Sequence, residues 1–210
     1  MVGRIITTDA CVAEGAAYLA QIEPRFAQAL QQMGPLPLRL KADGFEALLS
    51  AIVSQQISVA AAASIWKRLE AAQLIMPADV RGASENDLRS CGLSRPKIKY
   101  VKSLAESGLN YAVLREVPTE QVISQLIEIK GIGTWTAEIY AMFSLGRADV
   151  FAAGDLALQE AAKTLFDLDA RPSEKDFNVM AQAWSPWRAV AARLLWAYYR
   201  VIKDREGIRT

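Results

Sequence analysis

The segment LIEIKGIGTWTA, residues 126–137, decides the fold, because two glycines bracket one apolar residue between two stretches of helical period. Glycine tolerates positive φ and lets the backbone approach a ligand closely. The amides at the start of the second helix can therefore point at a phosphate oxygen, while Ile132 anchors the turn in the core. The segment predicts two helices joined by a tight turn at about 120–145. Taken alone, it is equally typical of a glycine-rich connection that binds nothing.

The rest of the chain also repeats at a helical period and contains no convincing pair of alternating strands, which predicts an all-α fold. Asp9–Met33 is expected to form one or two helices broken near Pro24, and an Ala-rich helix is expected to end near Ala72. Other predicted helices begin at cap-like residues, which are Asp43, Ser84, Ser94, Thr119, Thr134, Asp155, Ser173 and Ser185-Pro186. The N-terminal 40 residues receive no functional assignment.

Composition excludes several kinds of chemistry. The 210 residues include no histidine, which removes Ser-His and Cys-His nucleophile pairs and the commonest zinc ligand. Cys11 and Cys91 are far apart, so neither a disulfide framework nor a zinc or iron-sulfur site is expected. A net charge of +1 does not decide for or against nucleic acid, because a local patch can bind phosphates.

No stretch approaches the roughly 20 apolar residues that span a bilayer, so neither membrane insertion nor secretion is expected. The sequence instead predicts a cytosolic protein with a core of its own.

A second motif supports a functional interpretation of the glycine turn. Asp155 follows Gly133 by 22 residues, at the end of VFAAGD and the start of a predicted helix. Together these features resemble the helix-hairpin-helix DNA glycosylase superfamily, in its 3-methyladenine DNA glycosylase II branch. The resemblance spans about 43–199. It also rests on AIVSQQIS at 51–58, on GLS at 92–94 with the basic residues that follow, and on WSPWR at 184–188.

The resemblance implies one helical glycosylase domain over 1–210, with two lobes, a cleft between them and a catalytic loop at 149–155. It makes Asp155 the catalytic carboxylate. Departure of a base from deoxyribose builds an oxocarbenium-like cation, which a nearby carboxylate stabilises. Asp155 could act electrostatically or as a general base toward water. By pattern alone, an aspartate here is also a plain N-cap.

An enzyme that acts on a duplex base must flip the base out and hold it against flat side chains. We expect Trp135 and Trp196 to form the base pocket, with Trp187 and Tyr140 as further candidates. N-alkylated purines are cationic, and an electron-rich indole face favours them. The alternative for tryptophans is ordinary core packing, which we favour for Trp66, Trp184 and Trp187.

The space left by a flipped base is usually filled by a side chain on an exposed turn, and Gln56 is the candidate wedge. The alternative is that the glutamines there only satisfy a helix end. Lys97 lies in a basic stretch that could contact phosphates or simply face solvent. The full set of predicted DNA-binding residues is Gln56, Ser58, Lys97, Gly131, Gly133, Thr134 and Thr136.

Bifunctional members of the superfamily carry a lysine nucleophile where this chain has Trp135. The resemblance therefore implies a monofunctional enzyme that needs no cofactor and leaves an abasic site. It also implies a possible structural monovalent cation, held by the backbone carbonyls of Ile127, Ile129 and Ile132.

The sequence thus predicts hydrolysis of alkylated purines, such as 3-methyladenine and 7-methylguanine, from double-stranded DNA during base excision repair. The expected protein is a monomer located with the bacterial nucleoid or in a eukaryotic nucleus. Two alternatives stay open: a noncatalytic helix-hairpin-helix DNA-binding module, and a glycosylase for another class of lesion.

Overall fold

The computed structural model describes residues 1–205, and within them the chain forms helices and no β-strand, which confirms the predicted all-α class. The chain divides into two compact units. Unit 1 contains Lys41–Leu145 with the first two residues, and unit 2 contains Gly3–Leu40 together with the chain from Gly146. No helix in residues 1–205 combines the length and apolar character needed to cross a bilayer. The predicted placement of an active-site cleft between two lobes stays a prediction.

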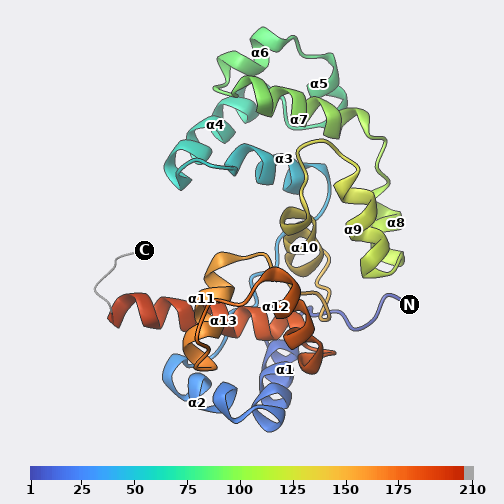
Figure 1. Ribbon diagram of the computed structural model, residues 1–210. Helices are drawn as coiled ribbons and strands as arrows, with labels where there is room; N and C mark the ends of the chain where they lie inside the picture. The colour runs from blue at the N-terminus through green and yellow to red at the C-terminus, as the bar shows by residue number, and fades with distance from the viewer. Residues whose placement is uncertain (206–210) are drawn as a thin grey trace. The chain divides into compact units, whose positions relative to one another are not determined.

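Unit 1 is a series of short helices joined by short turns (Figure 1). In chain order they are α3 (Phe45–Ser54), α4 (Val59–Ala71), α5 (Pro77–Gly82), α6 (Glu85–Ser90), α7 (Arg95–Glu106), α8 (Tyr111–Glu116), α9 (Thr119–Ile127) and α10 (Thr134–Phe143). Helix α7 packs against α3, α5 and α6, and α10 packs against α9 and α3.

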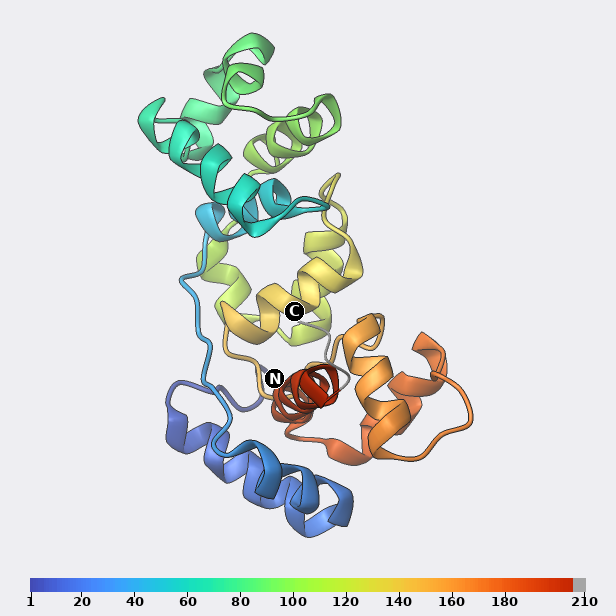
Figure 2. The same cartoon turned by 90° about the vertical axis from the view of Figure 1, so that its left-hand side faces the viewer.

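Unit 2 is built around its last helix. Its elements are α1 (Asp9–Ile22), α2 (Pro24–Met33), α11 (Leu156–Leu165), α12 (Glu174–Ala181), the 3-10 turn η1 (Gln182–Trp184) and α13 (Arg188–Arg205). Helices α1, α2 and α11 all pack against α13, which is seen nearly end-on in Figure 2. The N-terminal helices, which had no assignment from sequence, therefore complete the packing around the helix that carries Trp196.

Apolar residues at helical spacing form the core of each unit. In α3, Leu48, Leu49 and Ile52 are fully buried, and Ile65 and Leu69 of α4 are buried as well. In unit 2, edge-to-face and stacked rings surround Trp184, with centroids 5.2 Å from Phe26 and 5.8 Å from Phe166. Such pairs add to the free energy of burial. Trp184 is thus a core residue, as the sequence favoured.

Most predicted helix starts are confirmed, including the Ser84–Asp87 capping box and the Ser173 cap. Asp43 is a correction, because α3 is capped by Gly44 and the Asp43 carboxylate binds Arg115 instead. The last helix begins at Arg188 rather than at Ser185-Pro186. The short helices α5 and α8 were not predicted.

Gly15, in the middle of α1, gives a test of packing in unit 2. A Cβ at this position would lie 2.7 Å from both Trp187 Cε3 and Val190 Cγ2. Gly-to-Ala in a helix normally stabilises by up to about 1 kcal/mol. Here we expect Gly15→Ala to lower the free energy of unfolding by about 1–3 kcal/mol, because the core is overpacked. Denaturant titration of the variant and the wild type measures this change in the free energy of unfolding. Gly82→Ala, where a Cβ meets nothing within 4 Å, is the control.

Candidate functional site

The Asp155 carboxylate is held at the N-terminus of α11. Its Oδ1 accepts hydrogen bonds from the backbone amides of Ala157 (2.9 Å) and Leu158 (3.0 Å). The same oxygen accepts a hydrogen bond of 3.2 Å from the indole Nε1 of Trp196 on α13. Asp155 is therefore an N-cap, and it is half-buried rather than sealed in the core. The indole contact is an additional feature that a capping role alone does not need.

The loop that leads to Asp155 is fixed by side chains from the helices beside it. Gln159, which is buried in α11, donates from Nε2 to the carbonyl of Ala153 at 2.7 Å. At the start of the loop, Arg188 donates from Nε to Asp149 Oδ1 at 2.6 Å, and Ser185 Oγ donates to Asp149 Oδ2 at 2.9 Å. The predicted loop 149–155 is thus anchored at both ends.

Asp149 serves as a structural carboxylate in this loop. Burial raises the pKa of the Asp149 carboxyl, but the hydrogen bonds from Arg188 and Ser185 outweigh burial and hold that pKa below its ordinary value. Because the folded pKa is depressed, the stabilisation is present at neutral pH and is lost as the pH falls through the folded pKa.

The tryptophans of α13 and the turn before it have different roles. Trp196 is half-buried beside Asp155, where the sequence placed a pocket residue. Trp187 is a correction to the predicted pocket, because only 2 % of it is exposed. It packs against Gly15 of α1, and the Arg4 guanidinium lies 4.6 Å from its ring centroid. The core-packing alternative therefore describes Trp187.

In unit 1, the glycine turn has the predicted form of two helices, α9 and α10, joined by 128–133. Gly131 has a φ of +96°, and a Cβ there would lie 2.3 Å from Cγ of Tyr100, so both conformation and packing require glycine. Ile132 is buried and anchors the turn, as expected. Gly133 is the N-cap of α10, with no side-chain hydrogen bond.

Unlike Gly131, Gly133 is required neither by its backbone conformation nor by packing. Its φ is −91°, which any residue adopts, and a Cβ would meet nothing within 4 Å. Nothing within the fold of this unit therefore needs a glycine at this position. This open space is compatible with the predicted close approach of a ligand to the backbone, which stays a prediction.

The turn between α3 and α4 is connected to the glycine turn. Gln55 donates from Nε2 to the carbonyl of Gly131 at 2.9 Å, a link that the sequence analysis missed because the two residues are 76 positions apart. The next residue, Gln56, is exposed and has a φ of +57°, in the left-handed region that non-glycine residues rarely adopt. The candidate wedge thus lies on an exposed, conformationally constrained turn.

A hollow of about 720 Å³ lies within unit 1 beside this turn. Three aromatic side chains are among the residues that line it. The residues that matter here are Trp66, Trp135, Tyr140, Thr136, Gln55 and Gln56. Trp135 is 47 % exposed and Tyr140 only 4 %, so the first can offer a ring face and the second forms part of the rigid wall. Trp66, which the sequence assigned to the core, also lines the hollow.

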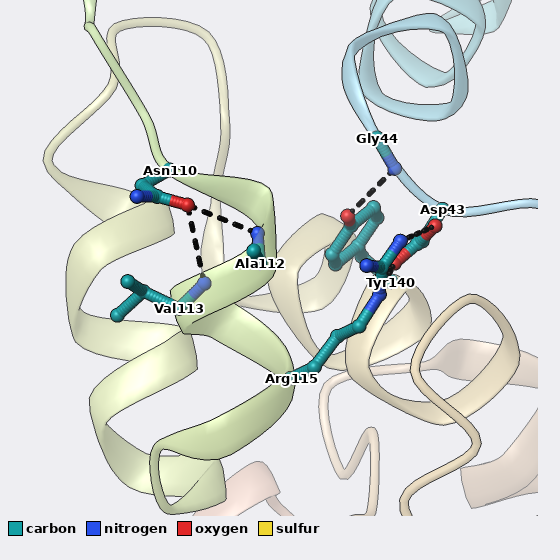
Figure 3. A network of polar contacts seen from close by, with 7 residues as sticks. All are labelled: Asp43, Gly44, Asn110, Ala112, Val113, Arg115 and Tyr140. Atoms are coloured by element: carbon teal, nitrogen blue, oxygen red, sulfur yellow. Dashed lines mark hydrogen bonds and ion pairs between the residues drawn. The ribbon is translucent and has the colours of Figure 1, made fainter.

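The Tyr140 side chain is held by a polar network (Figure 3). Its hydroxyl oxygen accepts a hydrogen bond of 2.9 Å from the backbone amide of Gly44. Beside it, Arg115 of α8 binds Asp43 through two hydrogen bonds of 2.7 and 2.8 Å. Burial raises the pKa of Tyr140 to about 12, so the phenol stays protonated at neutral pH. This network secures the chain where it enters α3.

Several predicted DNA-binding residues have structural contacts. Thr136 is a correction, because it is buried on the face of α10 that also carries Tyr140, whereas Thr134 is exposed. Lys97 donates from Nζ to the carbonyl of Val53 at 2.6 Å, and burial lowers the pKa of this ammonium. Ser58 caps α4 by accepting from the amide of Ala61 at 3.2 Å.

The predicted cation ligands are backbone carbonyls of the glycine turn. The carbonyl of Ile129 accepts a hydrogen bond of 3.0 Å from the amide of Ile132. A carbonyl oxygen has two lone pairs, so this bond is compatible with a cation at the same oxygen. Within the described residues, no group of three or more histidine, cysteine, aspartate or glutamate side chains could hold a metal ion.

The two glycines of the turn give a matched pair of variants. We expect Gly131→Ala to lower the free energy of unfolding by about 2 kcal/mol or more, because it combines left-handed strain with a clash against Tyr100. We expect Gly133→Ala to change it by no more than about 0.5 kcal/mol. Urea titration of both variants measures this difference, and equal losses would contradict the assignment of Gly133.

Comparisons with known proteins agree with this geometry. The family described as HhH-GPD superfamily base excision DNA repair protein matches residues 49–189. DNA-3-methyladenine glycosylase 1 of Schizosaccharomyces pombe is 32 % identical over 178 residues, which cover 80 % of this chain and 78 % of that protein.

Solved structures show the same similarity. The crystal structure of DNA-3-methyladenine glycosidase from Bacillus halodurans has a TM-score of 0.82 and 35 % identity, over 96 % of this chain and 94 % of that one. Schizosaccharomyces pombe Mag1, solved in complex with abasic DNA, has a TM-score of 0.73 and 28 % identity, over 87 % and 95 % of the two chains. This chain therefore belongs to the HhH-GPD superfamily of base excision DNA repair proteins.

Proposed function

We propose that this protein is a monofunctional DNA glycosylase, which hydrolyses the N-glycosidic bond of alkylated purines such as 3-methyladenine and 7-methylguanine in double-stranded DNA. The observation that carries the proposal is the Asp155 carboxylate, bonded to Trp196 at the N-terminus of α11 in a chain of this family. The names of the relatives support the alkylated-base class of substrate.

Asp155 would act on the sugar. As the base departs, positive charge develops on the deoxyribose ring, and a carboxylate near the anomeric carbon stabilises that charge more than it stabilises the neutral ground state. Three N–H donors fix Oδ1, so the carboxylate needs little reorganisation during the reaction. Either electrostatic stabilisation or activation of the attacking water uses the same placement.

The aromatic side chains would hold the flipped base. Trp196 lies beside the Asp155 carboxylate in unit 2, so it can offer an indole face to an alkylated purine. Trp135, which is exposed on α10 of unit 1, is the second residue that we propose for this role. Cationic purines are attracted to such faces and are good leaving groups. Selectivity then needs few hydrogen bonds to the base. Gln56 would fill the space in the duplex from its exposed turn.

The glycine turn would grip the DNA backbone without reading sequence. Support comes from Gly133, whose surroundings have room for a side chain that the sequence does not supply. A monovalent cation held by the carbonyls of Ile127, Ile129 and Ile132 would add positive charge at the phosphate. We further propose that the protein acts as a monomer, in the bacterial cytoplasm with the nucleoid or in a eukaryotic nucleus.

Asp155→Asn separates catalysis from capping. Asparagine is as good an N-cap as aspartate, so the fold should be retained while the negative charge is lost. We expect the single-turnover rate of methylpurine release from methylated duplex DNA to fall by a factor of about 10² or more. Asp176→Asn, which removes the same charge from the first turn of α12, is the matched control.

Melting temperatures of both variants show whether the fold is retained. If Asp155→Asn released 3-methyladenine as fast as the wild type, the protein would be a DNA-binding module with a contaminating activity. If the wild type released only deaminated or oxidised bases, the lesion class would be wrong while the enzyme class held.

Trp135 at the position of the lysine nucleophile predicts the product. We expect an abasic site in an intact strand, because no amine is placed there to form a Schiff base. Denaturing gels before and after alkali treatment measure strand cleavage, and borohydride reduction tests for a covalent adduct. A strand cut without alkali, or a trapped adduct, would contradict this prediction.

A further inference from the structure

Unit 2 contains a cluster of guanidinium groups close to the site residues. Arg193 of α13 is 2 % exposed and donates from Nε and Nη2 to the carbonyl of Leu38, at 3.2 and 3.1 Å. It also donates from Nη1 to the carbonyl of Ala189 at 2.9 Å. A buried arginine thus pins the chain at Leu38 to the face of α13.

The residue after the pinned carbonyl is in an unfavourable conformation. Arg39 has a φ of +54°, in the left-handed region that is unfavourable for a residue with a Cβ. A glycine here would avoid this cost, yet the position holds an exposed arginine. Strain of this kind is commonly retained where a side chain has a binding role.

Helical spacing brings Arg39 close to a second exposed arginine. Arg193, Trp196 and Arg200 are separated by three and four positions on α13, so their side chains share one face of the helix. The charges of Arg39 and Arg200 are near enough to repel, and burial together with this repulsion lowers the pKa of Arg39. Burial and Arg39 lower the pKa of Arg193 to about 10.

Neither Arg39 nor Arg200 forms an ion pair in the part of the chain that the structure describes. Holding like charges together without a counter-ion costs free energy, and an anion bound between them would recover it. Trp196, four positions before Arg200, donates to Asp155 Oδ1, so one face of α13 carries both Arg200 and the partner of the candidate catalytic carboxylate.

We propose that Arg39 and Arg200 form a phosphate clamp, which binds a backbone phosphate of the DNA strand that carries the target nucleotide. Guanidinium groups match the geometry of phosphate oxygens and bind them through paired hydrogen bonds. The clamp holds the sugar-phosphate backbone next to Asp155. The inference rests on the proposed function and adds to it a DNA contact made by unit 2, independent of the glycine turn.

The test compares Arg39→Gly, Arg200→Gln and the double variant with the wild type. Binding to a duplex that contains a stable abasic-site analogue is measured by fluorescence anisotropy at several salt concentrations. We expect each single variant to weaken binding roughly tenfold, and to reduce the slope of log K against log salt by about 0.9 per lost contact. Arg39→Gly should melt at the same temperature as the wild type or higher, because it relieves both strain and repulsion.

Two control variants isolate the effect. Lys175→Gln removes one exposed positive charge from α12 and should change binding less than twofold. Asp167→Gly relieves left-handed strain at a φ of +52° elsewhere in unit 2 and should leave binding unchanged. An equal loss of affinity in Lys175→Gln would overturn the clamp, because the effect would then be general attraction.

The same experiment distinguishes the two proposals. Wild-type excision of methylpurines with unaltered affinity and salt slope in Arg39→Gly and Arg200→Gln would overturn the clamp alone. A wild type that neither binds the duplex nor releases methylpurines would overturn the proposed function and the clamp together.

Discussion

The candidate functional site of unit 2 depends on one carboxylate oxygen that accepts three hydrogen bonds. Two backbone amides of α11 and the indole of Trp196 converge on Asp155 Oδ1, which ties the end of a loop to two helices. An N-cap of this kind is worth about 1 kcal/mol to the helix. The capping role is compatible with the catalytic role that we propose, because the cap determines where the carboxylate lies and leaves its second oxygen out of the cap.

In unit 1, two turns that carry candidate DNA-binding residues are connected by a side chain. The exposed turn with Gln56 and the glycine turn are linked by the Gln55 side chain, so the candidate wedge and the candidate phosphate-binding backbone are joined by a direct hydrogen bond between the two turns. Gly131 is required by its conformation and by Tyr100, whereas Gly133 is required by neither. The contrast separates a glycine that the fold requires from one that the fold does not require.

The net charge of this protein does not describe how its basic side chains are used. A net charge of +1 does not decide for or against DNA binding, whereas the tertiary structure brings Arg39 near the face of α13 that carries Trp196 and Arg200. Some basic residues are structural, as Lys97 shows by bonding the end of α3 and Lys102 by bonding the carbonyl of Arg81 at 2.9 Å. The number of basic residues in the sequence does not distinguish exposed side chains from those that bond the protein backbone, because only the tertiary structure sets the environment of each side chain.

The sequence by itself determined the all-α class, the glycine turn, most helix starts and the position of Asp155, since these depend on local propensity and short-range spacing. Only the tertiary structure decided which tryptophans are available. Trp187 is buried against α1, whereas Trp66 and Trp135 line a hollow. It also decided that Asp43 binds Arg115 and that Gln55 binds Gly131. These contacts join residues far apart in the chain, and no local pattern encodes them, because burial and pairing depend on how helices pack.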